Sequence, residues 1–338
     1  MSKSDLRKKA EIAPNTMTKL RRDEEVSLTK VIDVVCKIID EVSFAGTDSV
    51  MHGTIEKWQN TDKKLWKIYT KVRELQIFVT ERGRNNEGEN RPDSRLNVYE
   101  EKSKNLEELE RNLKRIKDEN IDLVTLGEMF NCPYQTPCFP VYAEMEQGET
   151  WQRLSALAKK YQIYLSAGSV PEKDKEGHVY NTAYVFDRQG NQIAKHRKVH
   201  LFDIAVKGGQ CYQESATLTA GDQITVFDTE FGKMGICICF DCRFPEIVRL
   251  MTLRGARMIL VPAAFNMTTG PAHWELMFRG RAVDNQCYMI GTSDARDEQA
   301  GYISWGHSLV VSPWGDVVTQ MDEKPGIQIT EIDLDRVD

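Results

Sequence analysis

The sequence predicts an α/β protein in which sheets and helices form layers. Short apolar runs, as at residues 121–126 and 258–263, have the length and composition of buried strands. Stretches with a helical spacing of apolar residues, such as residues 148–161, lie between such runs. The almost wholly apolar residues 234–240 are followed by Pro245, which suits the first turn of a helix. This alternation of strands and helices is typical of layered α/β domains.

The length and charge of the chain restrict the function classes to consider. Its 338 residues are enough for a full-size catalytic domain with a small appendage. A net charge of −6 argues against a nucleic-acid surface over the whole chain. The sequence begins without an apolar signal region, and no run approaches the roughly 18 to 20 apolar residues of a membrane helix. We therefore expect a cytoplasmic protein that uses no membrane and keeps its eight cysteines reduced.

The beginning of the chain, residues 1–38, is predicted to form a compact helical segment. A helix-turn-helix pattern is carried by residues 5–10, 12–20 and 26–28. The segment resembles a truncated phage-repressor-type helix-turn-helix that lacks the preceding helix. If it bound DNA, Asn15, Thr16 and Lys19 would begin the helix that faces the groove. The alternative, which we favour because so short a segment lacks a core, is an appendage that binds nothing; DNA is therefore a partner that we do not expect.

The middle of the chain, residues 39–96, is predicted to be a helical and linker region. Within it, residues 74–80 have the composition of a strand, and residues 82–94 are polar and rich in Gly and Asn, as in a loop. The third region, residues 97–338, is predicted to be one α/β domain. Its expected helices are residues 105–116, 148–161, 245 onward and 273–284; its expected strands are residues 121–126, 163–168, 234–240, 258–263, 287–291, 307–311, 316–319 and 327–332; its expected hairpins are at residues 187–191 and 229–232.

Three cysteines form a C-x-C-x-x-C pattern that can indicate zinc: Cys237, Cys239 and Cys242. Strand alternation points Cys237 and Cys239 to the same face, but no second Cys or His cluster has ligand spacing. We therefore predict no metal site.

Cys239 lies where a buried strand ends and a helix is about to begin. The positive end of a helix favours thiolate over thiol, so this position suits a nucleophile. Glu128 falls at the carboxyl end of another buried strand, and Lys198 lies just beyond a hairpin. Strand carboxyl ends gather the chemistry of α/β sheets. The three residues could therefore transfer an acyl group, with Glu128 as the base, Cys239 as the nucleophile and Lys198 offsetting charge on oxygen.

Each of these residues also has a simpler interpretation by itself. Glu128 could be a surface carboxylate, Lys198 a loop lysine and Cys239 a core thiol. A Cys–His pair is a further alternative, with three candidate histidines: His196, His200 and His307. We do not expect that pair, because the Glu–Lys pair already supplies a base and an electrophile.

Three motif blocks surround the candidate residues. They are Gly-Glu-Met-Phe-Asn-Cys-Pro-Tyr at residues 127–134, Arg-Lys-Val-His-Leu-Phe-Asp at residues 197–203, and Gly-Ile-Cys-Ile-Cys-Phe-Asp-Cys-Arg-Phe-Pro-Glu at residues 235–246. These blocks resemble those of the nitrilase (carbon–nitrogen hydrolase) superfamily. Four further blocks match in the same order, at residues 212–222, 270–276, 281–286 and 305–308. The resemblance runs from about residue 97 to the end of the sequence.

The resemblance implies an α-β-β-α sandwich that usually pairs sheet to sheet with a second subunit, so we expect a homodimer. It implies Glu128 as general base, Lys198 as the partner of the tetrahedral intermediate and Cys239 as nucleophile. Glu214 matches a second glutamate that orients the lysine and helps to place the attacking water. The backbone N–H of Phe240 would join Lys198 in holding the oxyanion. No metal or organic cofactor is implied, and a small amide would be hydrolysed through a thioester, with release of ammonia.

The motif block around Cys239 indicates which branch of the superfamily the chain resembles. True nitrilases usually carry Cys-Trp-Glu there, whereas this chain has Cys-Phe-Asp-x-Arg-Phe-Pro-Glu. With the first two blocks, this looks most like the omega-amidases, which deaminate α-ketoglutaramate and α-ketosuccinamate. The distal carboxylate of such a substrate needs a cation, for which we propose Arg243, and Tyr134 is the other predicted substrate-binding residue. The alternative for Arg243 is a pair with Asp241 or Glu246.

Three features depart from the superfamily. Gly127 stands where proline is usual, which could loosen the turn before Glu128. The first strand has two candidates, because residues 91–98 make a poor strand and residues 74–80 would leave a loop of about 20 residues. The sequence also ends soon after its last strand, where relatives carry a tail used in pairing. Two other functions therefore stay open: a DNA-binding regulator with a nitrilase-like sensor domain, and an inactive nitrilase-like scaffold.

Overall fold

The computed structural model describes residues 74–81, 97–205 and 211–334. The predicted helical segment at residues 1–38 lies outside this part of the chain. So do its candidate DNA-binding residues, Asn15, Thr16 and Lys19. None of the described helices is both long and apolar enough to cross a membrane.

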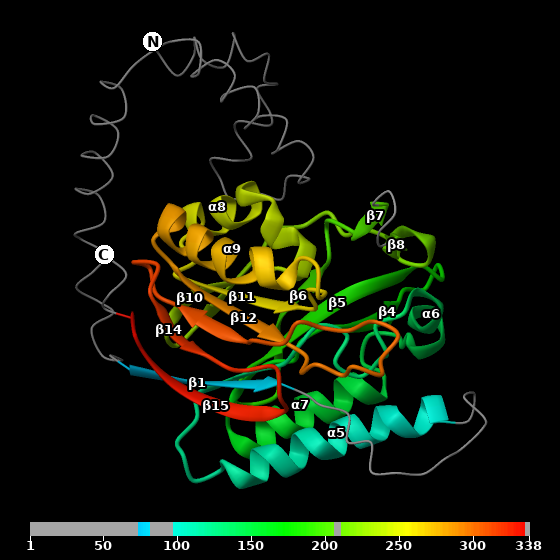
Figure 1. Ribbon diagram of the computed structural model, residues 1–338. Coiled ribbons are helices and arrows are strands. Elements are labelled where there is room, and N and C mark those ends of the chain that lie inside the picture. The colour runs from blue at the N-terminus through cyan, green and yellow to red at the C-terminus, as the bar shows by residue number, and fades with distance from the viewer. Residues whose placement is uncertain (1–73, 82–96, 206–210, 335–338) are drawn as a thin grey trace, which may run out of the picture. The chain divides into compact units, whose positions relative to one another are not determined.

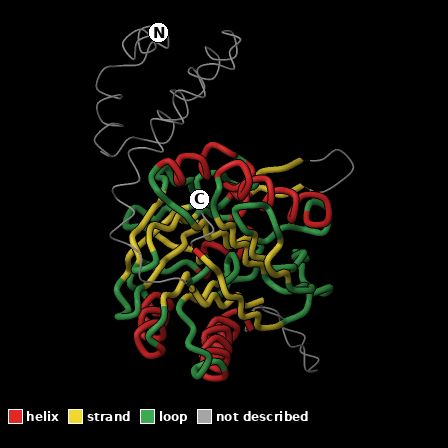
Figure 2. Tube along the Cα trace, turned by 90° about the vertical axis from the view of Figure 1, so that its left-hand side faces the viewer, coloured by secondary structure: helices red, strands yellow, loops and turns green. Residues whose placement is uncertain are grey.

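Two β-sheets lie between two pairs of helices in the described part of the chain (Figure 1). The helices α5 (Asn97–Arg115) and α7 (Glu149–Tyr161) cover one sheet, while α8 (Pro245–Leu253) and α9 (Gly270–Asn285) cover the other. Figure 2, at right angles, again shows the strands between the helices. The predicted α-β-β-α sandwich is confirmed.

The first sheet has seven strands in the order β15-β1-β2-β3-β5-β4, with β6 paired to β5. The strands are β1 (Glu74–Glu81), β2 (Leu123–Thr125), β3 (Tyr164–Ser166), β4 (Val170–Lys173), β5 (Val179–Phe186), β6 (Gln192–Arg197) and β15 (Gly326–Asp333). β1 runs parallel to β2 and antiparallel to β15, so of the two candidate first strands it is residues 74–80 that enter the sheet. The sheet thus includes a strand from the region assigned to a linker, and the domain boundary at residue 97 stays a prediction.

The second sheet has six strands in the order β14-β13-β12-β11-β10-β9. The strands are β9 (Thr225–Thr229), β10 (Gly232–Ile236), β11 (Met258–Ala263), β12 (Tyr288–Ser293), β13 (Leu309–Val311) and β14 (Val317–Gln320). β10, β11 and β12 are parallel, and every residue of β11 and β12 is buried. Burial on both faces explains why these strands are nearly continuous apolar runs rather than alternating ones.

The two sheets pack face to face, and the helices bury their apolar faces on the outer sides. Between the sheets, Thr125 Oγ1 of β2 lies 2.8 Å from Thr292 Oγ1 of β12, and both residues are buried. Outside the first sheet, α5 buries Leu106, Leu109 and Leu113. Their spacing of three and four residues keeps them on one face of the helix, which is why α5 lies against the sheet.

Both predicted hairpins are confirmed, because residues 187–191 join β5 to β6 and residues 229–232 join β9 to β10. α5 is longer than the predicted helix and begins at Asn97. A small sheet formed by β7 (Asp203–Ala205) and β8 (Cys211–Gln213) has no signal in the sequence. Its strands are short and largely exposed, so they need no apolar run.

Candidate active site

Four segments bring acidic, basic and thiol side chains to one place. Glu128 follows β2, and Lys198 follows β6 directly. Glu214 begins the short 3-10 helix η3 (Glu214–Ala216) just after β8. Cys239 begins a second one, η4 (Cys239–Arg243), shortly after β10. The segments with Glu128 and Lys198 belong to the first sheet and that with Cys239 to the second, so the cluster depends on how the sheets pack.

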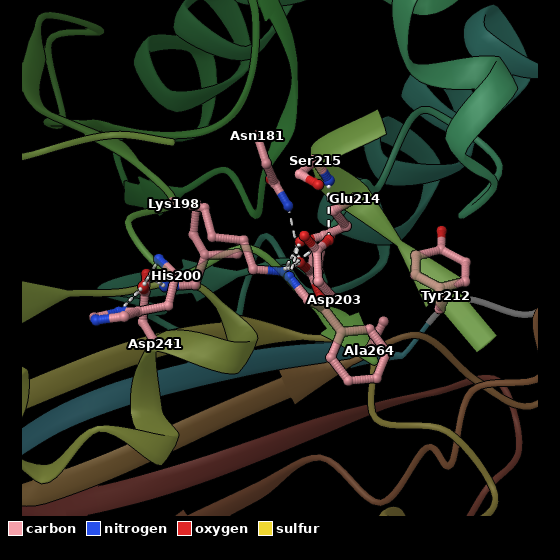
Figure 3. Close-up of polar contacts among 12 residues, drawn as sticks. Asn181, Lys198, His200, Asp203, Tyr212, Glu214, Ser215, Asp241 and Ala264 are labelled. Atoms are coloured by element: carbon pink, nitrogen blue, oxygen red, sulfur yellow. Dashed lines mark hydrogen bonds and ion pairs between the residues drawn. The ribbon is translucent and has the colours of Figure 1, made fainter. Parts of the chain in front are cut away.

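The Lys198 ammonium lies at the centre of this cluster. Its Nζ is 2.8 Å from Glu128 Oε1 and 2.9 Å from Glu214 Oε1. Figure 3 shows the Lys198 side chain reaching toward Glu214. These three side chains are fully buried, and Cys239, which is 5% exposed, interacts electrostatically with Glu128 and Lys198. The structure therefore brings the predicted triad and Glu214 together, while their catalytic roles stay a prediction.

The backbone of Cys239 is strained. Its φ of 46° lies in the left-handed region, which costs a residue with a side chain roughly 1–2 kcal/mol. The backbone N–H of Ala264, the residue after β11, donates to the Cys239 sulfur. Strain of this kind persists where the surrounding contacts hold it, and it occurs often at functional sites.

Glu128 is a carboxylate with one occupied and one free oxygen. Oε1 accepts from Lys198 Nζ and, at 2.8 Å, from Asn181 Nδ2. Oε2 is buried and has no hydrogen bond to another group in the described part of the chain. Burial raises the pKa of Glu128, and the negative charge of Glu214 adds to this, although Lys198 acts in the opposite direction. A buried carboxylate with a free oxygen and a raised pKa can accept a proton.

Lys198 is held in its charged form by two carboxylates. Burial alone would lower the pKa of Lys198, but the charges of Glu128 and Glu214 raise it well above its ordinary value. Glu214 is itself fixed, because it accepts from the backbone N–H of Phe202 at 2.6 Å and from the Tyr134 hydroxyl at 2.7 Å. The ammonium is therefore a fixed positive charge beside Cys239.

The prediction that a helix end favours a Cys239 thiolate is wrong. Burial raises the pKa of Cys239 well above its ordinary value, and the charge of Glu128 adds to the rise more than Lys198 offsets. The helix α8 begins only at Pro245, and the five residues of η4 separate it from the sulfur. Cys239 is thus a neutral thiol that needs a base, and Glu128 is the carboxylate beside it.

A family model described as carbon–nitrogen hydrolase matches residues 91–338. The chain belongs to the carbon–nitrogen hydrolase family. Omega-amidase NIT2 of Xenopus tropicalis is 48% identical over 234 residues, which cover 69% of this chain and 84% of that protein. Omega-amidase NIT2 of Homo sapiens is 49% identical over 215 residues, which cover 64% of this chain and 78% of that protein.

Two solved structures agree with this family. Nit3 of Saccharomyces cerevisiae, described as a member of branch 10 of the nitrilase superfamily, is 37% identical, with a TM-score of 0.67 over 79% of this chain and 92% of that chain. The NitFhit protein of C. elegans is 31% identical, with a TM-score of 0.68 over 79% of this chain and 62% of that chain. The predicted nitrilase superfamily and the predicted amidase-type hydrolase are therefore confirmed.

Two predicted residues of this carbon–nitrogen hydrolase, Tyr134 and Phe240, are aromatic residues of the site. Tyr134 is buried, and its ring centroid lies 4.5 Å from that of Tyr302 and 5.6 Å from that of Tyr212. Because the Tyr134 hydroxyl donates to Glu214, this residue supports the carboxylate as well as lining the site. Phe240 follows Cys239 in η4 and packs edge-on against Phe202, with centroids 5.2 Å apart.

Arg243 lies at the end of η4 among aromatic rings. Its guanidinium carbon is 5.0 Å from the ring centroid of Phe265 and 5.7 Å from that of Phe240. Its Nη1 is 3.2 Å from His273 Nδ1. Within the described part of the hydrolase, Arg243 forms no ion pair with either of the alternative partners, Asp241 and Glu246. The alternative pairing is thus wrong, and the guanidinium is available to an anion.

Some residues of the site are missed by sequence reasoning. Asn181 is the third residue of β5, and an Asn within this mostly apolar strand is the signal that could have found it. Tyr302 donates to the carbonyl of Ala264 at 2.6 Å, and Tyr212 donates to the carbonyl of Tyr134 at 3.3 Å. Burial and the charges nearby raise the pKa of both phenols, so both stay neutral donors.

The three histidines do not act as a Cys–His pair in this geometry. His196 and His200 both bind the Asp241 carboxylate, through Nε2 at 3.1 Å and Nδ1 at 2.8 Å respectively. His307 stacks on Trp305, with ring centroids 4.2 Å apart, and its Nδ1 lies 2.9 Å from the Trp305 carbonyl oxygen. The titratable side chain that acts on the Cys239 thiol most strongly is the Glu128 carboxylate instead.

Proposed function

We propose that this carbon–nitrogen hydrolase is an omega-amidase, which converts a short ω-amide of the α-ketoglutaramate or α-ketosuccinamate class to a carboxylate and ammonia. The observation that carries the proposal is the buried network of Glu128, Lys198 and Glu214 beside the Cys239 thiol. The relatives named omega-amidase support the substrate class.

The first half of the reaction forms a thioester. Glu128 Oε2 takes the proton of the Cys239 thiol, and the sulfur attacks the amide carbon. The former carbonyl oxygen becomes negative, and the Lys198 ammonium and the backbone N–H of Phe240 stabilise it. Glu128 then gives its proton to the amide nitrogen, the C–N bond breaks, and ammonia leaves the thioester on Cys239.

The second half of the reaction releases the acid. Glu128 takes a proton from a water molecule, and the hydroxide attacks the thioester carbon. The second tetrahedral intermediate places its negative oxygen at the same two donors, Lys198 and Phe240 N–H. The C–S bond then breaks, and the proton on Glu128 returns to the Cys239 sulfur. Glu214 keeps Lys198 in place throughout, and no cofactor takes part in these steps.

The distal carboxylate of the substrate binds Arg243 in this proposal. The guanidinium lies four residues after Cys239, packs on Phe240 and has no acidic partner in the described part of the chain. Arg is suited to a carboxylate because two of its N–H groups can donate in parallel. Tyr134 and its aromatic neighbours form a wall of the same site.

A homodimer and a cytoplasmic location complete the proposal. The homodimer is what the family resemblance implies. Leu276 and Val283 expose apolar side chains on α9, which supports a partner on this helical face and not on a sheet. The location depends on the sequence argument alone.

Ammonia release from two amides tests the proposal. We expect Arg243→Lys to lower kcat/KM for α-ketoglutaramate about 10- to 100-fold, since a charge-assisted pair contributes roughly 1.5–3 kcal/mol. The same variant should change kcat/KM for a neutral amide such as butyramide less than about threefold. Arg279→Lys is the matched control, because Arg279 lies on α9 and pairs with Glu275. An equal fall in kcat/KM for both amides would show that Arg243 does not bind the distal carboxylate. A wild-type protein that released no ammonia from either amide would contradict the proposed omega-amidase activity.

A further inference from the structure

Asp241 is a fully buried carboxylate for which the proposed reaction has no role. It lies in η4, two residues after Cys239. Its Oδ1 accepts from the backbone N–H groups of Val199 and His200, at 3.2 and 2.8 Å, and from His200 Nδ1 at 2.8 Å. Its Oδ2 accepts from the backbone N–H of Ile238 at 3.0 Å and from His196 Nε2 at 3.1 Å.

These hydrogen bonds join two segments that are far apart in the sequence. Val199 and His200 follow Lys198 directly, and Ile238 directly precedes Cys239. The first segment continues from β6 of the first sheet, and the second from β10 of the second sheet. One carboxylate thus connects the backbone beside the lysine with the backbone beside the thiol.

We propose that Asp241 is a positioning residue that fixes the Lys198 ammonium relative to the Cys239 sulfur. This inference rests on the proposed function, because it assumes that Lys198 stabilises the oxyanion formed when Cys239 attacks. Such stabilisation depends on donors held in advance where the charge develops, and a shift of about 1 Å can lower a rate about 100-fold.

The surroundings of Asp241 keep it in place as an acceptor. Burial would raise the pKa of Asp241, but hydrogen bonds from His196, His200 and the Ile238 N–H together hold it well below its ordinary value. The His200 ring is stacked on Phe244, with ring centroids 3.7 Å apart, and Phe244 directly follows η4. The lysine segment is therefore attached to both ends of the turn that carries Cys239.

The effect of Asp241→Asn on kcat and KM tests the inference. The amide keeps the size of the side chain, but its NH2 group faces N–H donors in place of a carboxylate oxygen. We expect kcat for α-ketoglutaramate, per folded enzyme, to fall about 100-fold while KM changes less than about threefold, because the substrate-binding groups are unchanged. The folded fraction at the assay temperature is taken from a thermal melt followed by near-UV circular dichroism.

Asp174→Asn is the matched control for this experiment. Asp174 also accepts from a backbone N–H and a ring nitrogen, those of His178, but it lies on the β4–β5 hairpin away from Cys239. Its variant should keep the wild-type kcat. If Asp241→Asn lowered only the melting temperature and kept kcat per folded enzyme, the role of Asp241 would be structural and the inference wrong. A wild-type protein without activity would instead refute the proposed function.

His200→Phe provides a second test should Asp241→Asn fail to fold. The phenyl ring can keep the stacking on Phe244 but loses the Nδ1 donor to Asp241. We expect kcat per folded enzyme to fall about tenfold with KM nearly unchanged, as for a partly released positioning group. A kcat within about twofold of the wild-type value would overturn the inference.

Discussion

Glu128 is the residue whose protonation controls the proposed chemistry. It must be ionised to accept the thiol proton of Cys239, and burial together with the charge of Glu214 raises its pKa. We therefore expect kcat/KM to rise with pH along an acidic limb that lies above about 4.3, the pKa of an ordinary glutamate. Because the pKa of Lys198 is also raised, its loss of charge should cause no fall in rate below about pH 10.

The measurement is the rate of ammonia release from α-ketoglutaramate between about pH 4 and pH 10. Each sample is returned to neutral pH and assayed again, so that unfolding is separated from titration. Glu128 and the Cys239 thiol influence each other's pKa, so the limb belongs to this pair rather than to one isolated carboxyl. A rate that stayed constant down to about pH 4 would contradict a raised pKa of the base.

The identity of the site residues could be predicted from the sequence because each lies in a long motif, but their electrostatics could not. In the sequence, Cys239 stands shortly before Pro245, where a helix was expected to begin, and this suggested that a helix dipole acts on the thiol. The sequence does not say that Glu128, from the other sheet, lies against the sulfur and raises its pKa. Asn181 and Tyr302 were missed for the same reason, since their contacts link distant segments.

The turn after β3 determines where the Glu128 segment lies. Gly168 has a φ of +62°, and a Cβ added there would lie 2.1 Å from the Gly127 carbonyl oxygen. Gly127 in turn has Asp294 against it, with 2.6 Å between an added Cβ and Asp294 Oδ1. Asp294 therefore occupies the space that the Cβ of a proline at residue 127 would need.

Gly168→Ala should destabilise the protein strongly. The left-handed backbone costs roughly 1–2 kcal/mol for alanine, and the clash with Gly127 adds roughly 1–3 kcal/mol. Gly177→Ala is the control, because Gly177 also has a positive φ, +92°, but nothing lies within 4 Å of an added Cβ. We expect a loss of roughly 2–5 kcal/mol in the free energy of unfolding for Gly168→Ala and roughly 1–2 kcal/mol for Gly177→Ala. Urea unfolding measures both, and equal losses would contradict the close approach at Gly168.

Among the secondary-structure elements, the sequence predicts those that depend on residues close together along the chain. The β5–β6 and β9–β10 hairpins follow from turn residues, and the buried strands β11 and β12 from apolar runs. The position of β1 could not be decided, because its partners β2 and β15 are, respectively, about 45 and 250 residues away along the chain. The short helix η4 was also missed, since burial and Asp241 rather than propensity hold it.

In the whole molecule, the site lies where the two sheets face each other. The first sheet carries Glu128 and Lys198, and the second carries Cys239, so correct packing of the sheets assembles the chemistry. The first strand, which the sequence left undecided, is β1, and it pairs with β15 along eight residues at one edge of the first sheet. The described part of the chain thus has the complete sandwich that the proposed reaction requires.

The most direct test of the account is the mass of the Cys239 peptide from enzyme quenched with acid during turnover of α-ketoglutaramate. We predict that this peptide gains the mass of the substrate less ammonia, as a thioester on the Cys239 sulfur. Cys239→Ala should form no adduct and release no ammonia, whereas Cys211→Ser, which changes an exposed thiol, should behave as the wild type. Ammonia release by Cys239→Ala at the wild-type rate, or an adduct on another residue, would contradict the account.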